Sequence, residues 1–296
     1  MADRAPEPAT VAPGTIGAAV PRLAHRSADF IADVGLYRMM VGARIRSDWQ
    51  YRTSFITFLV GQGLVTVLDF VTIVLLLDLV PGLGGWSATE VVFLYGLASV
   101  PFGVADLVVS AVERVGVYVQ AGTFDRLLLR PVPALLQISA LEFELRRAGK
   151  IIPPLAVLVW AIPNVDVDWT VGSVVLLAVA LICGTAIYSA LWILSAALSF
   201  WVVATKEATY AATYGGQFAN QYPLHLYRGW IRAVLGWAIP LAFVAYVPAV
   251  SLLDAANPLS LPQWLVFASV PVAGLAVGLS MLAWTVGIRH YQSTGS

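Results

Sequence analysis

The chain has 296 residues, 59% of them hydrophobic and only 11% charged, and its mean hydropathy is +0.81. Soluble globular domains carry charge on about a quarter of their residues. The composition therefore excludes a water-soluble fold and predicts one all-α polytopic membrane domain, since in lipid the backbone must satisfy its own hydrogen bonds.

The N-terminal segment precedes the first apolar stretch. Residues 1–25 are rich in Ala, Pro and Thr, and Arg4 is followed by no apolar core, so we expect a disordered cytosolic tail and not a secretory signal. Residues 26–52 place apolar side chains on one helical face, which predicts an amphipathic helix on the inner membrane surface: Phe30, Val34, Tyr37, Val41 and Ile45. Arg44 lies near that apolar edge, and a soluble lead-in helix stays open as the alternative.

Six stretches are long and apolar enough to cross a hydrocarbon layer about 30 Å thick, which takes roughly 20 residues of helix. The third and fifth contain prolines, which spanning helices tolerate. The predicted spans are Phe55–Leu77, Val91–Val112, Leu145–Ile162, Val171–Val203, Trp230–Val247 and Trp264–Ile288.

The basic residues give these spans an orientation, because Lys and Arg gather in cytosolic segments. With the N-terminus inside, all 17 fall in the predicted cytosolic segments 1–54, 113–150, 204–232 and the C-terminal tail. The predicted outer loops, 78–90, 163–170 and 248–263, contain none. The sequence therefore predicts a six-helix transmembrane domain at 53–290, a cytosolic tail at 291–296, and a proline-containing re-entrant segment at 248–263 in the outer leaflet.

No pattern for catalysis stands out. The phosphate-binding pattern GxxxxGK[ST] is missing, since Gly149-Lys150 is followed by Ile151 and has no glycine-rich lead-in. The three histidines are far apart, and the only cysteine, Cys183, excludes a disulfide within the chain. We expect no enzyme activity, no bound cofactor or metal, and no nucleic-acid partner.

Two carboxylates fall inside predicted spans, Asp69 and Asp106. An ionised group at mid-bilayer costs several kcal/mol, so such residues face a partner or a watery path. One hypothesis places both on a transport path, with Gln62 on the helical face of Asp69. The alternative is structural: Asp69 bonds a neighbouring helix, and Asp106 reaches cytosolic water.

The cytosolic loop 113–137 contains a compact turn. Val115–Ala121 can form a short helix that ends at Gly122, and Thr123 fits the N-cap of a second turn. Prolines terminate that turn, which carries the charged residues Asp125, Arg126 and Arg130. Phe124 and the leucines beside it would face water unless another subunit covers them, so the sequence predicts a docking element.

The stretch Gly122-Thr-Phe-Asp-Arg-Leu-Leu-Leu-Arg-Pro-Val-Pro133 resembles the hallmark of a subfamily of ABC-2 type permeases. Further likenesses cover roughly 40–290: Gln50-Tyr-Arg-Thr-Ser-Phe55, the segment Gly85–Gly96, Tyr222-Pro-Leu-His-Leu-Tyr227 and the segment Ile239–Pro248.

This resemblance implies a type V exporter-like half-transporter in the bacterial inner membrane, with both termini cytosolic. It implies pairing with a second permease, identical or a paralogue, and with two ATPase subunits that bind ATP and Mg. The loop would be the coupling helix that docks on the ATPase, together with the N-terminal amphipathic helix. The implied coupling residues are Gly122, Phe124, Asp125, Arg126, Leu129, Arg130, Pro131 and Pro133.

Two other functions stay open at this point. An ion-gradient-driven transporter would use Asp69 or Asp106 as its coupling carboxylate, although no convincing internal repeat is present. A membrane scaffold or enzyme subunit without transport activity is the third hypothesis. The scarcity of charge within the spans favours a hydrophobic or amphiphilic cargo.

Overall fold

The computed structural model describes residues 27–79, 83–130, 132–202, 205–253 and 257–291. The predicted tail at 1–25, most of that at 291–296, and Pro131 lie outside these ranges. The described part of the chain is helical, and its only extended pairing is an isolated bridge between Leu83 and Trp86.

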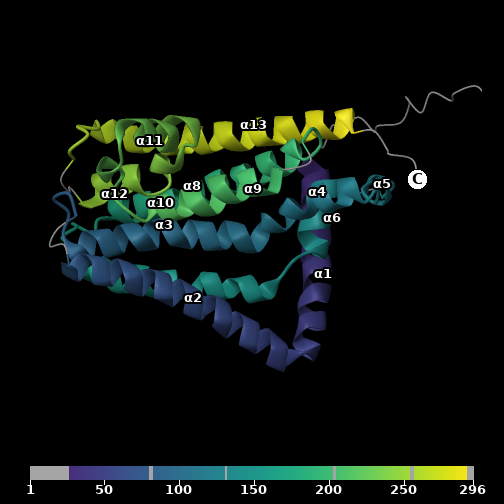
Figure 1. Cartoon of the computed structure of the whole chain (residues 1–296), viewed down its shortest axis with the longest axis horizontal. Coiled ribbons are helices and arrows are strands. Elements are labelled where there is room, and N and C mark those ends of the chain that lie inside the picture. Colours follow the sequence, from purple (N-terminus) through teal and green to yellow (C-terminus); the bar gives the residue numbers. More distant parts are fainter. Residues whose placement is uncertain (1–26, 80–82, 131, 203–204, 254–256, 292–296) are drawn as a thin grey trace, which may run out of the picture.

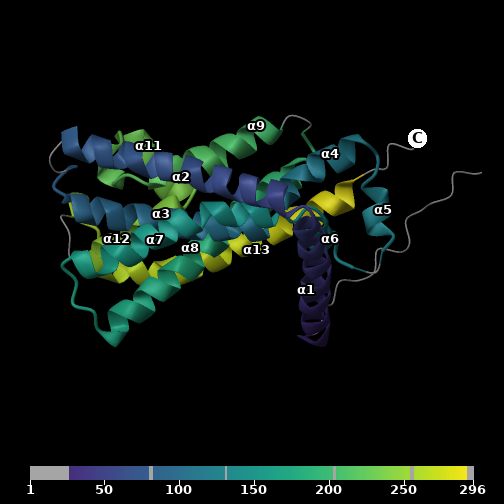
Figure 2. The same ribbon diagram turned by 90° about the horizontal axis from the view of Figure 1, so that it is seen from below.

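Four long helices run side by side and form the bundle (Figures 1 and 2): α2 (Arg52–Leu79), α3 (Ala88–Val108), α8 (Val171–Leu198) and α13 (Ser269–His290). Each is long and apolar enough to cross a membrane, and a bent helix pair can be counted as a fifth span within the described residues. α3 lies at the centre, since 83% of its apolar window is buried, whereas only 6% of the window in α2 is buried.

A shorter helical run, η2 (Leu145–Lys150), α7 (Ile152–Ala161) and η3 (Ile162–Asn164), packs between α2 and α3. Prolines open α7, where the missing N–H costs no helical hydrogen bond. Gly149 allows the close approach to α2, because a Cβ there would collide with the carbonyl oxygen of Leu59.

A polar helix packs along one side of the bundle and is made of α9 (Thr205–Tyr210), the π-helical η4 (Ala211–Gly215) and α10 (Gly216–Asn220). Its buried polar side chains find partners on α8 and α3. The Asn220 amide donates to the Tyr188 hydroxyl over 3.3 Å, and the Gln221 amide donates to Ser99 Oγ over 3.4 Å. These bonds offset the cost of placing amides in an apolar interior.

The segment after α10 and η5 (Leu224–Leu226) folds as a hairpin of α11 (Gly229–Ala233), the π-helical η6 (Val234–Ala238), η7 (Leu241–Phe243) and α12 (Tyr246–Leu253). The two limbs are bent by 74° at Pro240. The tip reaches the middle of the bundle, where Val244 lies against Gly184.

Both limbs of this hairpin lead back to one end of the bundle, here called the α12 end (Figure 1). His225, just before the hairpin, lies 6.2 Å from the Trp86 ring, and Tyr246 stacks on the same ring at 5.7 Å. The predicted fifth span, Trp230–Val247, is therefore wrong: this segment enters and leaves at the same end. The predicted re-entrant segment 248–263 contains only the last turns of α12, the residues after it and the start of η8 (Gln263–Ala268).

The position of the hairpin also corrects the prediction that all basic residues gather at one end of the bundle. Arg228 and Arg232 border the hairpin at the α12 end, beside the loop that contains Gly84, and not at the end where the loop 113–137 lies.

The opposite end, here called the α5 end, carries the loop between α3 and α7. It contains η1 (Ser110–Arg114), α4 (Val115–Gln120), α5 (Asp125–Leu128) and α6 (Ala134–Leu141). α1 (Ser27–Gln50) crosses this end roughly perpendicular to the bundle and packs on α6. The Tyr37 hydroxyl of α1 donates to the Val108 carbonyl of α3 over 3.4 Å.

Candidate functional site

The turn between α4 and α5 has a fixed backbone. Gly122 ends α4 at φ +63°, a left-handed conformation that suits glycine. The Tyr118 carbonyl accepts hydrogen bonds from the amides of Thr123 at 3.0 Å and Phe124 at 3.2 Å. Thr123 is not the predicted N-cap, because its hydroxyl also donates back to the Tyr118 carbonyl.

Phe124 holds this turn against the bundle. Its side chain is 0% exposed, and its ring meets three other rings, here called the aromatic anchor together with Phe124: Phe200 at 5.2 Å, Tyr291 at 5.1 Å and Trp284 at 6.5 Å. The prediction that Phe124 is displayed for a partner is therefore wrong. The ends of α8 and α13 cover it, so Phe124 fixes the turn from within.

The opposite face of α5 is open. Leu129 is 85% exposed and Leu128 43%, and the side chains of Arg126 and Arg130 are exposed beside them. Asp125 is half-buried. Burial raises the pKa of the Tyr291 hydroxyl, and the nearby Asp125 raises it further. α5 thus presents two leucines between two arginines on a backbone that the aromatic anchor holds in place.

A buried amide braces the chain after α5. Gln137 of α6 is 1% exposed, and its amide donates to the Leu127 carbonyl at 2.9 Å and the Val132 carbonyl at 2.7 Å. Pro133 is half-buried and directly precedes α6. The loop is therefore tied at both ends of α5.

An ion-pair network lies beneath this loop and centres on Asp106, which is fully buried. Its carboxylate accepts from Arg147 at 2.9 Å and Tyr214 at 3.1 Å, and lies 3.0 Å from the Lys150 ammonium. Arg147 also donates to Ser110 Oγ at 2.6 Å. A buried carboxylate with two cations and a hydroxyl is compensated, so Asp106 joins α3 to η2 and the polar helix.

The network continues toward the loop. Glu144 accepts from Arg146 at 2.7 Å and Arg147 at 3.1 Å, and Arg114 pairs with Glu142 at 2.9 Å. The Tyr118 hydroxyl of α4 donates to Glu142 at 2.6 Å. Burial and this acidic neighbour raise the pKa of Tyr118 to about 12.

The pKa values of two carboxyls in this network are shifted in opposite directions. Burial tends to raise the pKa of Glu144, but the hydrogen bonds and charges of Arg146 and Arg147 outweigh it and lower that pKa. Burial, aided by the charge of Asp106, raises the pKa of Glu113. Each carboxyl therefore reports how well the network compensates it.

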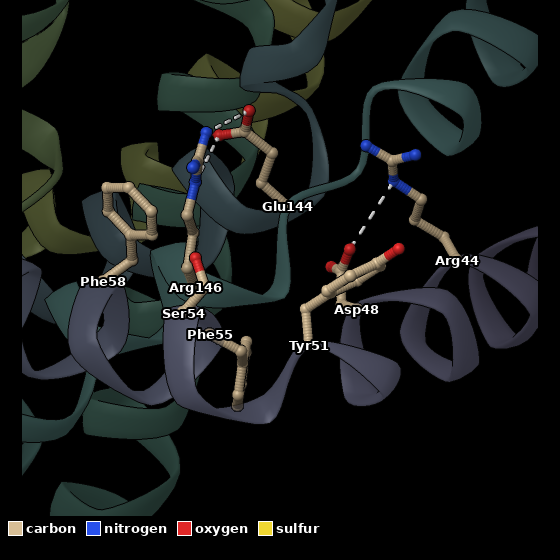
Figure 3. Close-up of a pocket in the computed structure, with 8 residues that line it drawn as sticks. All are labelled: Arg44, Asp48, Tyr51, Ser54, Phe55, Phe58, Glu144 and Arg146. Carbon is tan, nitrogen blue, oxygen red and sulfur yellow. Dashed lines mark hydrogen bonds and ion pairs between the residues drawn. The ribbon is translucent and has the colours of Figure 1, made fainter.

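A cavity of about 160 Å³ lies where α1 meets α2 beside this network (Figure 3). The Arg146 guanidinium lies 5.0 Å from the centre of the Phe58 ring of α2 and donates to Glu144. Arg44 pairs with Asp48, one turn away on α1. The corner between α1 and α2 is thus in contact with the segment that carries the network.

The three residues of the predicted transport path do not come together. Asp106 is held inside the network, and Gln62 packs against Gly149. Asp69 lies on the exposed face of α2, close to the hydroxyls of Tyr95 and Tyr222, and forms no ion pair within the described residues.

The sequence reasoning missed the cations of the network. Arg147 entered only the orientation argument, and Lys150 entered that argument and the rejected phosphate-binding pattern. Both follow Glu142 and Glu144 within nine residues, a charge cluster at the edge of an apolar segment. Tyr214 was missed because its segment was assigned to a cytosolic loop. No cluster of three or more metal-ligating residues occurs in the described part of the chain.

Comparison with known proteins identifies the family. The family model described as "ABC-2 family transporter protein" matches residues 64–295, more than half of the chain. No curated protein and no solved structure gave a match. The matched region includes the α5 turn, the ion-pair network and the hairpin, in a chain with several helices able to cross a membrane. The chain therefore belongs to the ABC-2 family of transporter proteins and is a membrane-embedded permease.

Proposed function

We propose that the chain is the membrane-spanning permease subunit of an ATP-driven exporter in a bacterial inner membrane. It would work with two separate ABC ATPase subunits and a second permease, identical or a paralogue. ATP and Mg would bind to the ATPases. The family match supports the permease role.

One observation carries the coupling part of this proposal: α5 presents an exposed Leu128–Leu129 pair between Arg126 and Arg130 on a turn anchored from within. Apolar side chains beside arginines on a rigid element are typical of interface hot spots. In this proposal Leu129, Arg126 and Arg130 contact the ATPase, with Asp125 at the edge, while Phe124 transmits the displacement to α8 and α13.

The fold supports a count of six crossings, which we derive differently from the sequence prediction. The four long helices make four crossings, and the run η2–α7–η3 makes another. The polar helix α9–α10 makes the remaining one, and the α11–α12 hairpin re-enters from the outer side. In this proposal both termini and the α5 end lie in the cytosol, as the docking of an ATPase requires.

The ion-pair network suits a connection between docking site and bundle. It joins α4 through Tyr118 and Glu142, α3 through Asp106, and the polar helix through Tyr214. A movement of α5 would therefore reach the helices that border a path between two permeases. The apolar spans favour a hydrophobic or amphiphilic cargo.

Co-purification tests the docking proposal. The double variant Arg126→Glu with Leu129→Asp should reduce the ATPase recovered with the tagged permease at least about tenfold, since hot-spot residues contribute about 2 kcal/mol or more. Arg289→Glu is the matched control, because Arg289 is an exposed arginine at the end of α13. Unchanged ATPase recovery with the double variant, in folded protein, would refute α5 as the docking site.

The ion-gradient alternative loses one of its two carboxylates in this geometry. Asp106 is paired with Arg147 and Lys150, so its carboxylate already has two cationic partners within the chain. In proteoliposomes that contain both subunits, we expect substrate accumulation to require ATP and to persist when the ion gradient is collapsed.

A further inference from the structure

The α11–α12 hairpin contains a cavity that neither the docking proposal nor the bundle uses. Its volume is about 290 Å³, close to the lower limit of small-molecule sites, which begin near 300 Å³. The lining is apolar except for one arginine, Arg232, and comes from four segments: Leu224 of η5, the α11 limb, the α12 limb and residues 259–265.

The position of that arginine is unusual for this chain. Arg228 and Arg232 lie at the α12 end, whereas the described basic residues of the loop 113–150 and Arg289 lie at the α5 end. Neither forms an ion pair in the described part of the chain. An arginine beside a lipid-facing surface costs free energy unless an anion or the interface receives it.

Exposed tryptophans surround this arginine. Trp237 lines the cavity and is 78% exposed, and Trp230 is 68% exposed on α11. Indole rings favour the level of the lipid headgroups, so they place the mouth of the cavity where the acyl chains begin. A guanidinium at that level can bind a phosphate through two parallel hydrogen bonds.

We propose that this cavity binds one acyl chain of an anionic phospholipid from the leaflet at the α12 end, with Arg232 on its phosphate. The apolar lining takes the acyl chain, because burial of its methylenes is favourable. The charge of Arg232 selects an anionic headgroup over a zwitterionic one. The site requires neither the ATPase nor transport, so it is tested on the permease alone.

A glycine offers a clean way to block the site. Gly236 lines the cavity, and a Cβ at this position would meet nothing within 4 Å. Gly236→Leu should therefore occupy the cavity without displacing the hairpin. Gly274→Leu is the matched control, since Gly274 in α13 is also open and lies away from the cavity lining.

Native mass spectrometry of the purified permease can count the bound lipids. The protein is mixed with phosphatidylglycerol or phosphatidylcholine of the same acyl chains. Both lipids offer a phosphate to Arg232, but only phosphatidylglycerol has a net negative charge, so wild type should retain it about fivefold better. Arg232→Gln should abolish this preference, and Gly236→Leu should abolish retention of the bound lipid. Arg289→Gln and Gly274→Leu should leave both unchanged.

Three results would overturn the proposal. The first is equal retention of the two lipids by wild type, which would mean that Arg232 only reaches the headgroup layer. The second is undiminished retention by Gly236→Leu. The third is displacement of the lipid by inorganic phosphate alone, which would indicate a site for the free anion.

A structural role for Arg232 is tested separately. Asp254 follows α12 in the sequence, and a pairing of Arg232 with it would make Asp254→Asn and Arg232→Gln equivalent. The lipid site instead predicts that Asp254→Asn keeps the preference for phosphatidylglycerol. Loss of the preference in both variants would refute it.

Discussion

At the scale of single residues, Phe124 decides whether the docking turn is rigid. Its ring is fully buried in the aromatic anchor between the ends of α8 and α13. Phe124→Ala should lower the free energy of unfolding by about 3–5 kcal/mol, the usual loss when a buried ring is truncated. Thermal unfolding of the purified permease measures this effect. Leu128→Ala, on the exposed face of the same helix, is the control, and equal unfolding temperatures for the two variants would contradict the anchor.

Asp106 is the second residue whose removal should be costly. Asp106→Asn leaves Arg147 and Lys150 without their buried counter-charge, so we expect a loss of about 3–5 kcal/mol in stability. Adding Lys150→Met should restore part of that loss, because it removes one of the orphaned charges. A double-mutant cycle from thermal or denaturant unfolding checks the coupling. Additive effects of the two substitutions would mean that the pair does not interact.

Glu144 and Glu113 make the network sensitive to pH in opposite senses. The pKa of Glu144 is lowered by its arginines, so its stabilisation is present above the unfolded value of about 4.3 and is lost as pH falls through the folded pKa. Glu144→Gln should therefore have a lower unfolding temperature than wild type at pH 7. The difference between the two unfolding temperatures should become smaller as pH falls below about 4.

Glu113 provides the matched contrast. Its pKa is raised, mainly by burial, so the ionised carboxylate is unfavourable in the folded protein and protonation relieves that cost as pH falls. Glu113→Gln should leave the unfolding temperature at pH 7 unchanged or higher. A loss at pH 7 equal to that of Glu144→Gln would show that burial does not dominate at Glu113.

At the scale of elements, the long apolar helices and the glycine–proline turn could be predicted from the sequence, because both are local signals. The proposed fifth crossing by α9–α10 could not be predicted from the sequence. The segment 205–220 is polar and was assigned to the cytosol, while the apolar segment 230–247 was assigned to the lipid. Hydropathy averages cannot register that Asn220 and Gln221 have partners on α8 and α3, far away in sequence. The burial of Phe124 was equally hidden, since it depends on Phe200 and Tyr291.

The corrected course of the chain makes a direct prediction about sidedness. With Cys183 replaced by alanine, Arg228→Cys should react with a membrane-impermeant maleimide added outside the cell. Leu129→Cys should react only after the membrane is opened, because the proposed arrangement has the α5 end in the cytosol. Labelling of Arg228→Cys only from the cytosolic side would restore the predicted fifth span at Trp230–Val247.

At the scale of the whole molecule, α2 is the most exposed of the four long bundle helices. Only 6% of its apolar window is buried, so almost the entire helix faces outward. Lipid could cover its leucines and valines at no cost, but it could not cover the ionised carboxylate of Asp69. Asp69 lies on this exposed face without an ion pair in the described residues. We therefore expect a protein neighbour or a watery path along α2, and in the proposed assembly the second permease would provide one of these.

Cross-linking tests where that second permease lies. In the background without Cys183, Leu68→Cys beside Asp69 should form an intermolecular disulfide in membranes treated with a mild oxidant, if the partner is a second copy of this chain. Leu275→Cys on the exposed face of α13 is the control, since Leu275 has similar exposure but no carboxylate beside it. For a paralogous partner, the same cysteine should form a disulfide with a cysteine introduced into the equivalent helix of that permease, and not with a second copy of itself. Cross-links through α13 with none through α2 would place the interface elsewhere and would leave Asp69 to face lipid, which its charge makes unfavourable.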